Sequence, residues 1–230
     1  MPGVHSILNS SFIAHAPPTS CNIKLCIADV EELSDGNIHI AFDHSNMVSA
    51  TISNTPLANG LAKNIYSSVL KIADQYVFKH VFKIADGSSP MGYNKWSLES
   101  ELKIIYLGRH LLEEFYSQLQ GSPVDYSNNF IYTTAFLAEE VANSDGSNLS
   151  VALEISADEY LDEVTKDMDS QLLTMTHVNA PNLHAMTVNT FAHFTIQYTD
   201  GQVLFVDLQA SKAHVGGKLK YILFDSIIHT

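Results

Sequence analysis

Alternation of apolar and polar residues dominates the first 85 positions of the chain. Apolar runs at 22–30, 39–42 and 47–52 predict short strands, separated by turn-forming residues such as those at 43–46. The run 76–83 alternates most regularly and is rich in β-formers, which predicts a further strand. Residues 1–20 predict a loose polar arm, and 56–60 a turn.

A long helix is predicted at 97–120, where apolar residues recur at three-, four- and seven-residue spacings: Leu98, Leu102, Ile105, Leu112, Phe115 and Leu119. Ser97 is the expected cap at its start, and Gly121-Ser-Pro123 the expected stop. The remainder is mixed, with strands expected at 129–137 and 149–155 and helical character at 158–173 and 183–194. This order of elements predicts an α+β fold, possibly with two lobes.

The closing part of the chain predicts a β-hairpin. Alternating apolar runs at 191–198 and 203–209 flank the turn dipeptide Asp200-Gly201. A helix at 183–194 would lead into this hairpin.

Composition narrows the functional classes. The 230 residues are 46% hydrophobic and 16% charged, as in a globular protein, with a formal net charge of −13. Such acidity argues against binding nucleic acid or an anionic membrane through charge. No run of about 18 apolar residues predicts a membrane span, and the N-terminus shows no secretory signal. With only Cys21 and Cys26, we expect an intracellular, cytoplasmic protein whose two thiols are buried, the alternative being one disulfide bridge.

A lysine and two glutamates in the first half suggest a nucleotide site. Lys79 lies between apolar neighbours in a predicted strand, where its amine could reach a phosphate, although a solvent-facing lysine on an edge strand is the more common situation. Glu99 and Glu101 fall in the expected first turn of the long helix, where an acid favours the helix dipole whatever its function. A strand lysine paired with a helix glutamate is also the arrangement by which kinases position the amine.

Polar residues near the C-terminal end of the chain suggest a cation site. Asp207 and Gln209 lie two residues apart in the predicted strand, so they would share a face and could bind Mg²⁺ through oxygen atoms. Asp225 follows an apolar run and could orient an attacking hydroxyl. The alternatives are a polar pair near a turn and an acid that caps a turn. His193, between aromatic residues, is by itself more typical of a core histidine than of a metal ligand.

These segments together resemble the alpha-kinases, a family of atypical protein kinases. The family carries motifs similar to Phe191-Ala-His193-Phe-Thr195, to Val206-Asp207-Leu-Gln209 and to Asp225-Ser-Ile-Ile-His229-Thr230. Val77-Phe-Lys79 resembles the family's Val-Ala-Lys strand, and Val151-Ala-Leu-Glu154-Ile155 the stretch at its lobe junction. The resemblance covers roughly residues 50–230.

The resemblance implies a two-lobed kinase-like fold and a Ser/Thr protein kinase that uses ATP and Mg²⁺ on a protein substrate. It implies an arm and first strands at 1–50 and a kinase-like domain at 51–230, with an N-lobe at about 20–135 and a C-lobe at about 150–230. The residue roles that it implies are phosphate contact by Lys79 with Glu101 as partner, Glu154 at the adenine end, Mg²⁺ or phosphate binding by Asp207 and Gln209, catalysis by Asp225, and a zinc ligand in His193.

The sequence departs from the family pattern after His229-Thr230. In the family a glycine-rich loop and a His/Cys/Cys cluster follow and complete a zinc site, so we do not expect His193 alone to form that site. Ser226 stands where proline is usual, and the stretch between Gln209 and Asp225 is longer than usual, with residues 212–220 inserted. We therefore expect a truncated product, a divergent member or an inactive relative. The alternative function is a pseudokinase or interaction module without phosphoryl transfer.

Overall fold

The computed structural model describes residues 20–59, 63–72, 75–85, 91–141, 149–154, 173–174, 183–206, 208–224 and 227–229. Strands dominate these residues, and two helices accompany them, which confirms the predicted α+β class. The predicted arm lies outside the described residues except for Ser20, and so does the predicted helix at 158–173 except for Leu173. The boundaries proposed for the two lobes stay a prediction.

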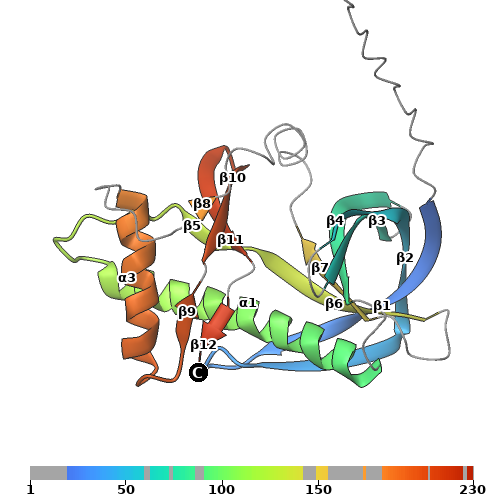
Figure 1. The fold of residues 1–230 in the computed structure, drawn as a ribbon, viewed down its shortest axis with the longest axis horizontal. Coiled ribbons are helices and arrows are strands. Elements are labelled where there is room, and N and C mark those ends of the chain that lie inside the picture. Colours follow the sequence, from blue (N-terminus) through green and yellow to red (C-terminus); the bar gives the residue numbers. More distant parts are fainter. Residues whose placement is uncertain are drawn as a thin grey trace, which may run out of the picture.

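Six strands close into a barrel in the order β1-β2-β3-β4-β7-β6 (Figure 1). They are β1 (Ser20–Glu32), β2 (Ile38–Asn59), β3 (Lys63–Ile72), β4 (Gln75–Ala85), β6 (Thr134–Glu140) and β7 (Leu149–Glu154). Among the side chains that the structure describes, β1, β2, β3 and β6 contribute one buried cluster: Leu25, Ala50, Ile52, Leu70 and Ala138. The alternating pattern of the sequence thus supplies a packed core on the inner face.

Strand β2 includes the two strands predicted at 39–42 and 47–52. It also continues to Asn59 through most of the turn predicted at 56–60, so the prediction of that turn is wrong. The register with β1 shifts between Cys26 and Ala28, where Asp43–Asn46 form a bulge in β2. The Asp43 carboxylate accepts hydrogen bonds from the Ser45 amide, at 2.9 Å, and from the Ser45 hydroxyl, at 2.7 Å. These polar residues form a local turn inside a strand, after which pairing resumes.

The second lobe contains a sheet in the order β5-β11-β10-β8 and a separate pair, β12-β9. Its strands are β5 (Phe130–Tyr132), β8 (Leu173–Thr174), β9 (Leu204–Val206), β10 (Gln209–Val215), β11 (Lys218–Phe224) and β12 (Ile227–His229). Helix α3 (Leu183–Tyr198) packs on these strands through Val188 and Phe191. Aromatic residues fill much of this core, with the Phe191 and Phe205 rings stacked 6.0 Å apart.

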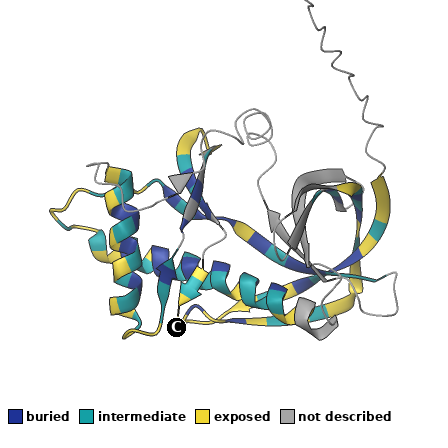
Figure 2. Cartoon of the chain, in the orientation of Figure 1, coloured by how far each residue is buried: buried dark blue, intermediate teal, exposed yellow. Residues whose placement is uncertain are grey.

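Helix α1 (Met91–Leu119) is shared by both lobes and confirms the predicted apolar stripe. Leu98, Leu102 and Ile105 are buried against β1, β2 and β6, whereas Leu112 and Phe115 are buried in the core of the second lobe. Figure 2 shows this burial along the helix where it passes under both lobes. The helix begins six residues before Ser97, so the predicted cap is wrong.

The predicted C-terminal hairpin is also wrong, because residues 191–198 belong to α3. Asp200-Gly201 ends this helix instead of joining two strands. Gly201 donates its N–H to the Ile196 carbonyl at 2.8 Å, and Asp200, at φ 50°, donates to the Gln197 carbonyl at 3.4 Å. These two bonds are a Schellman motif, which satisfies carbonyl groups at the helix end. An Asp-Gly pair with left-handed backbone serves a helix end as well as a hairpin.

Both cysteines are free, so the disulfide alternative does not apply. Cys26 is buried as expected, but Cys21 is exposed near the start of β1, which corrects the expectation of two buried thiols.

Candidate active site at the lobe junction

Lys79 belongs to β4, which pairs with β3 on one side and β7 on the other. β4 therefore has a neighbouring strand on each side and is not an edge strand, so the edge-strand interpretation of this lysine is wrong. The Lys79 backbone pairs with Val69. The Lys79 side chain lies outside what the structure describes, so its contact with phosphate stays a prediction.

Glu101 lies in α1, but not in its first turn, because the helix begins at Met91. The predicted favourable effect on the helix dipole is therefore wrong for both Glu99 and Glu101. Glu99 lies 4.0 Å from the Lys95 ammonium, one helical turn away. Glu101 is half-buried, and α1 contacts β4, β6 and β7. Helix and strand are thus neighbours, while the pairing of Glu101 with Lys79 stays a prediction.

Glu154 is the last residue of β7 and lies where the strands pass from one lobe to the other. It pairs with His80 of β4 on one side and with Thr134 of β6 on the other. The residue before Thr134, Thr133, is the link between β5 in the second sheet and β6 in the barrel, and its N–H donates to the Leu223 carbonyl at 2.9 Å. The predicted adenine-end residue therefore lies at the junction of the lobes.

The register also relates Glu154 to Lys79. Directly paired residues share a face of a sheet, and successive residues alternate between faces. Since Glu154 pairs with His80, the Glu154 and Lys79 positions lie on opposite faces of the same sheet. One ligand can reach both positions only around the end of the sheet or through backbone groups.

The Asp207–Gln209 segment is where the chain changes sheets. β9 ends at Val206 and pairs with β12, whereas β10 begins at Gln209 and pairs with β11 and β8. The prediction of one strand carrying both polar residues is therefore wrong. Leu208, between them, is buried in the core. Asp207 and Asp225 lie outside the described residues, as does the Gln209 side chain.

The described residues that flank these positions are paired with one another. Val206 pairs with Ile227, and Gln209 pairs with Phe224. The residue before Asp207 therefore lies beside the described residue that follows Asp225, and the described residue that follows Asp207 in β10 lies beside the residue before Asp225. The two segments are neighbours although they are far apart along the chain.

His193 lies on α3 and is exposed, so the expectation of a core histidine is wrong. The strand expected for its motif is helix α3. Among the described residues, no group of three or more His, Cys, Asp or Glu side chains could hold a metal ion.

A buried polar cluster in the second lobe was not predicted. The Ser127 hydroxyl lies 2.8 Å from His184 Nδ1, and the backbone N–H of Ser127 donates to the Thr187 hydroxyl at 2.9 Å. The Tyr116 hydroxyl donates to the Ser127 carbonyl at 3.1 Å. The cluster fixes the loop after α1 against the start of α3. No local pattern could have revealed it, because Ser127 and His184 are 57 residues apart.

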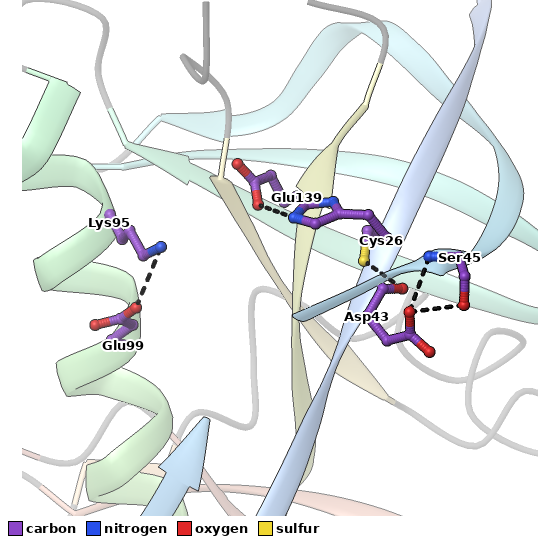
Figure 3. A network of polar contacts seen from close by, with 7 residues as sticks. Cys26, Asp43, Ser45, Lys95, Glu99 and Glu139 are labelled. Carbon is purple, nitrogen blue, oxygen red and sulfur yellow. Dashed lines mark hydrogen bonds and ion pairs between the residues drawn. The ribbon is translucent and has the colours of Figure 1, made fainter. Parts of the chain in front are cut away.

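A second polar network surrounds the β2 bulge (Figure 3). The Cys26 thiol donates to the Asp43 carbonyl at 3.2 Å, and His44 Nε2 lies 4.0 Å from the Glu139 carboxylate. Burial, followed by the charge of Glu139, raises the pKa of the Cys26 thiol. A buried thiol that resists ionisation is not suited to nucleophilic catalysis.

Comparison with known proteins gives the family. The model of the alpha-kinase family matches residues 58–230. The chain belongs to the alpha-kinase family. No curated protein matches it.

Solved alpha-kinase structures share the fold. An alpha-kinase from Entamoeba histolytica is 16% identical, with a TM-score of 0.60, over 93% of this chain and 80% of that one. The alpha-kinase domain of myosin heavy chain kinase A in complex with AMP is 13% identical, with a TM-score of 0.58, over 91% of this chain and 85% of that one. The same domain in complex with AMP-PNP gives the same identity and TM-score, over 91% and 82%. These likenesses confirm the predicted two-lobed alpha-kinase fold.

Neither helix in the described part of the chain is long and apolar enough to cross a membrane.

Proposed function

We propose that this alpha-kinase family member is a Ser/Thr protein kinase that transfers the γ-phosphate of ATP to a protein hydroxyl with Mg²⁺. The family match includes every position to which the resemblance gives a role. Structures of similar fold are complexes with AMP, ADP and AMP-PNP, which supports a nucleotide site in this fold.

The observation that carries the proposal is the pairing around the two acidic segments. Val206 pairs with Ile227 and Gln209 with Phe224, which supports a shared location for Asp207 and Asp225. In this proposal the oxygen atoms of Asp207 and Gln209 hold Mg²⁺, which would neutralise charge on the phosphates.

Asp225 orients the acceptor hydroxyl in this proposal. The hydroxyl oxygen forms a bond to the γ-phosphorus, while the bond from that phosphorus to the bridging oxygen breaks and ADP leaves. The hydroxyl proton passes to the Asp225 carboxylate. General base assistance of this kind contributes roughly 10²–10⁴-fold to rate.

Lys79 and Glu154 would contact opposite ends of the nucleotide. Lys79 binds the phosphates, with Glu101 as its partner on α1. Because the Glu154 position lies on the opposite face of the sheet from Lys79, we propose that the nucleotide reaches Glu154 around the end of the sheet, where Glu154 is the last residue of β7. This detail is a consequence of the register.

Phosphate transfer from radiolabelled ATP tests the proposal. The acceptors are dephosphorylated casein, which is acidic, and a histone, which is basic, followed by analysis of the phosphorylated amino acids. We expect phosphoserine or phosphothreonine and a loss of about 10²-fold or more in Asp225→Asn. Asp125→Asn, in an exposed loop, is the matched control with unchanged activity.

Two other results would separate the alternatives. MgATP binding without any transfer would support the pseudokinase alternative. Transfer that survives in Asp225→Asn would show that Asp225 is not the general base.

A further inference from the structure

The β10–β11 hairpin is a positively charged element in an acidic protein. The chain has 25 acidic residues against 12 lysines and arginines. Yet residues 208–224 contain Lys212, Lys218 and Lys220 and no acid. Local charge here is therefore opposite in sign to that of the whole molecule.

The three lysines differ in how far they are exposed to a partner. Lys218 is exposed near the hairpin tip, and Lys212 and Lys220 are half-buried. The Lys220 ammonium donates to the Asn128 carbonyl at 3.0 Å, and the Lys212 ammonium lies 6.0 Å from the Tyr221 ring centre. Within the described part of the chain, no carboxylate forms an ion pair with any of them. Leu219 is 43% exposed, and the register places it on the same face of the hairpin as Lys212 and on the opposite face from Lys218 and Lys220.

The backbone of β10 offers an edge beside these charges. β11 pairs with β10 over its whole length, but β8 pairs only with Gln209 and Ala210. Among the described strands, none covers the outer edge of residues 211–215. The turn at Gly216 and Gly217, with φ of 59° and 71°, holds the hairpin in a twisted two-residue connection. Figure 2 shows the exposed tip above a buried base.

We propose that the β10–β11 hairpin binds an extended acidic segment of the protein substrate. The open edge supplies backbone hydrogen bonds, as in recognition by strand addition, and the lysines select carboxylates. The identification of the partner as a substrate rests on the proposed kinase function. The association of an acidic segment with the hairpin does not depend on that function.

The geometry sets where the acids of the substrate should lie. Phe224 ends β11 at the base of the hairpin, and Asp225 is the next residue in the sequence. Lys220 and Lys218 are four and six residues before Phe224. At about 3.3 Å per residue, they lie roughly 13 and 20 Å from the base. An extended substrate would therefore carry its acids about four to six residues from the phosphorylated hydroxyl.

A lysine on an edge strand, as Lys212 is on β10, also prevents edge-to-edge aggregation, and the experiment must separate this role from docking. Binding is measured by fluorescence anisotropy with a labelled peptide that contains one threonine and glutamates four to six residues away. The matched peptide has glutamine in place of glutamate. Both are measured without nucleotide, so the result does not depend on catalysis.

We expect the glutamate peptide to bind more tightly than the glutamine peptide, with an affinity that falls as salt rises. The triple variant Lys212→Gln, Lys218→Gln, Lys220→Gln should weaken its binding about tenfold or more. Lys218→Gln alone, at an exposed position that leaves the fold unchanged, should weaken it about twofold to fivefold. Lys103→Gln, an exposed lysine on α1, is the control with unchanged binding.

Equal binding of the two peptides, or equal binding by the wild type and Lys218→Gln, would overturn the proposal. Aggregation of the triple variant together with unchanged binding by Lys218→Gln would assign the lysines to edge protection. If the protein transfers phosphate, Lys218→Gln should raise KM for the glutamate peptide and leave kcat unchanged. Peptide binding without transfer would leave the docking surface in place and reject the kinase proposal alone.

Discussion

Replacing Gly108 in α1 by alanine tests how tightly this helix packs against the lobe junction. A Cβ atom at this position would lie 2.5 Å from Cζ and 2.8 Å from the hydroxyl oxygen of Tyr132 in β5. Tyr132 is buried, and its ring contacts Phe191 and Phe205 at centroid distances of 6.4 and 6.0 Å. The tyrosine ring therefore has little room to move away from the new methyl group.

Two effects of Gly108→Ala oppose each other. Alanine favours the helix over glycine by about 1 kcal/mol. Overpacking of a rigid core costs about 1–3 kcal/mol, and a contact as short as 2.5 Å falls towards the upper part of that range. We therefore expect the free energy of unfolding to decrease by about 1–2 kcal/mol.

Urea unfolding followed by circular dichroism measures the change. Ser117→Ala, at an exposed position of α1, is the control, and it should show a small gain because only helix propensity changes. Adding Tyr132→Leu to Gly108→Ala should recover part of the loss, which would show that the two positions interact. A Gly108→Ala protein at least as stable as the wild type would refute this packing argument.

Three further changes probe other parts of the fold. Leu102→Ala, in the fully buried part of α1, should lower the free energy of unfolding by about 2–5 kcal/mol in urea, and a smaller loss would mean that the core relaxes. Burial raises the pKa of Tyr116 to about 12, so its contribution to the free energy of unfolding is present below about pH 10 and is lost as pH rises towards 12. Tyr116→Phe should therefore reduce the loss of stability at alkaline pH. An unchanged dependence of the free energy of unfolding on pH between about 10 and 12 would contradict this. Hydrogen bonds from Ser45 lower the pKa of Asp43, so its stabilisation is lost as pH falls below its ordinary value; Asp43→Asn should reduce acid sensitivity in that range, and an identical acid unfolding profile would exclude this effect.

Local patterns predict the elements whose stability is local. The apolar stripe of α1 predicts a buried helix face, and the alternation at 76–83 predicts a strand; the buried residues of α1 and the bounds of β4 confirm both. The prediction of a hairpin at Asp200-Gly201 is wrong because the same dipeptide also suits a Schellman motif. Which of the two forms depends on the packing of Phe191 against distant strands. The predicted break between the strands at 39–42 and 47–52 is wrong for a similar reason. The turn residues at 43–46 interrupt the register with β1, but the strand β2 continues through them.

The candidate site depends still more on non-local pairing. Spacing suggests that Asp207 and Gln209 share a strand, but the chain changes sheets between Val206 and Gln209. The partners that decide this, β11 and β12, follow later in the sequence. Likewise, only the pairing of His80 with Glu154 reveals that Glu154 and Lys79 occupy opposite faces. Sequence resemblance gives the order of these residues, and register gives their arrangement.

Calorimetric titration with MgATP tests the central claim, a nucleotide site at the lobe junction, most directly. We predict saturable binding by the wild type, weakened about tenfold or more in Lys79→Ala because a charged hydrogen bond to phosphate is lost. Lys103→Ala should bind like the wild type. No detectable heat at millimolar MgATP, or equal binding by Lys79→Ala, would contradict the claim.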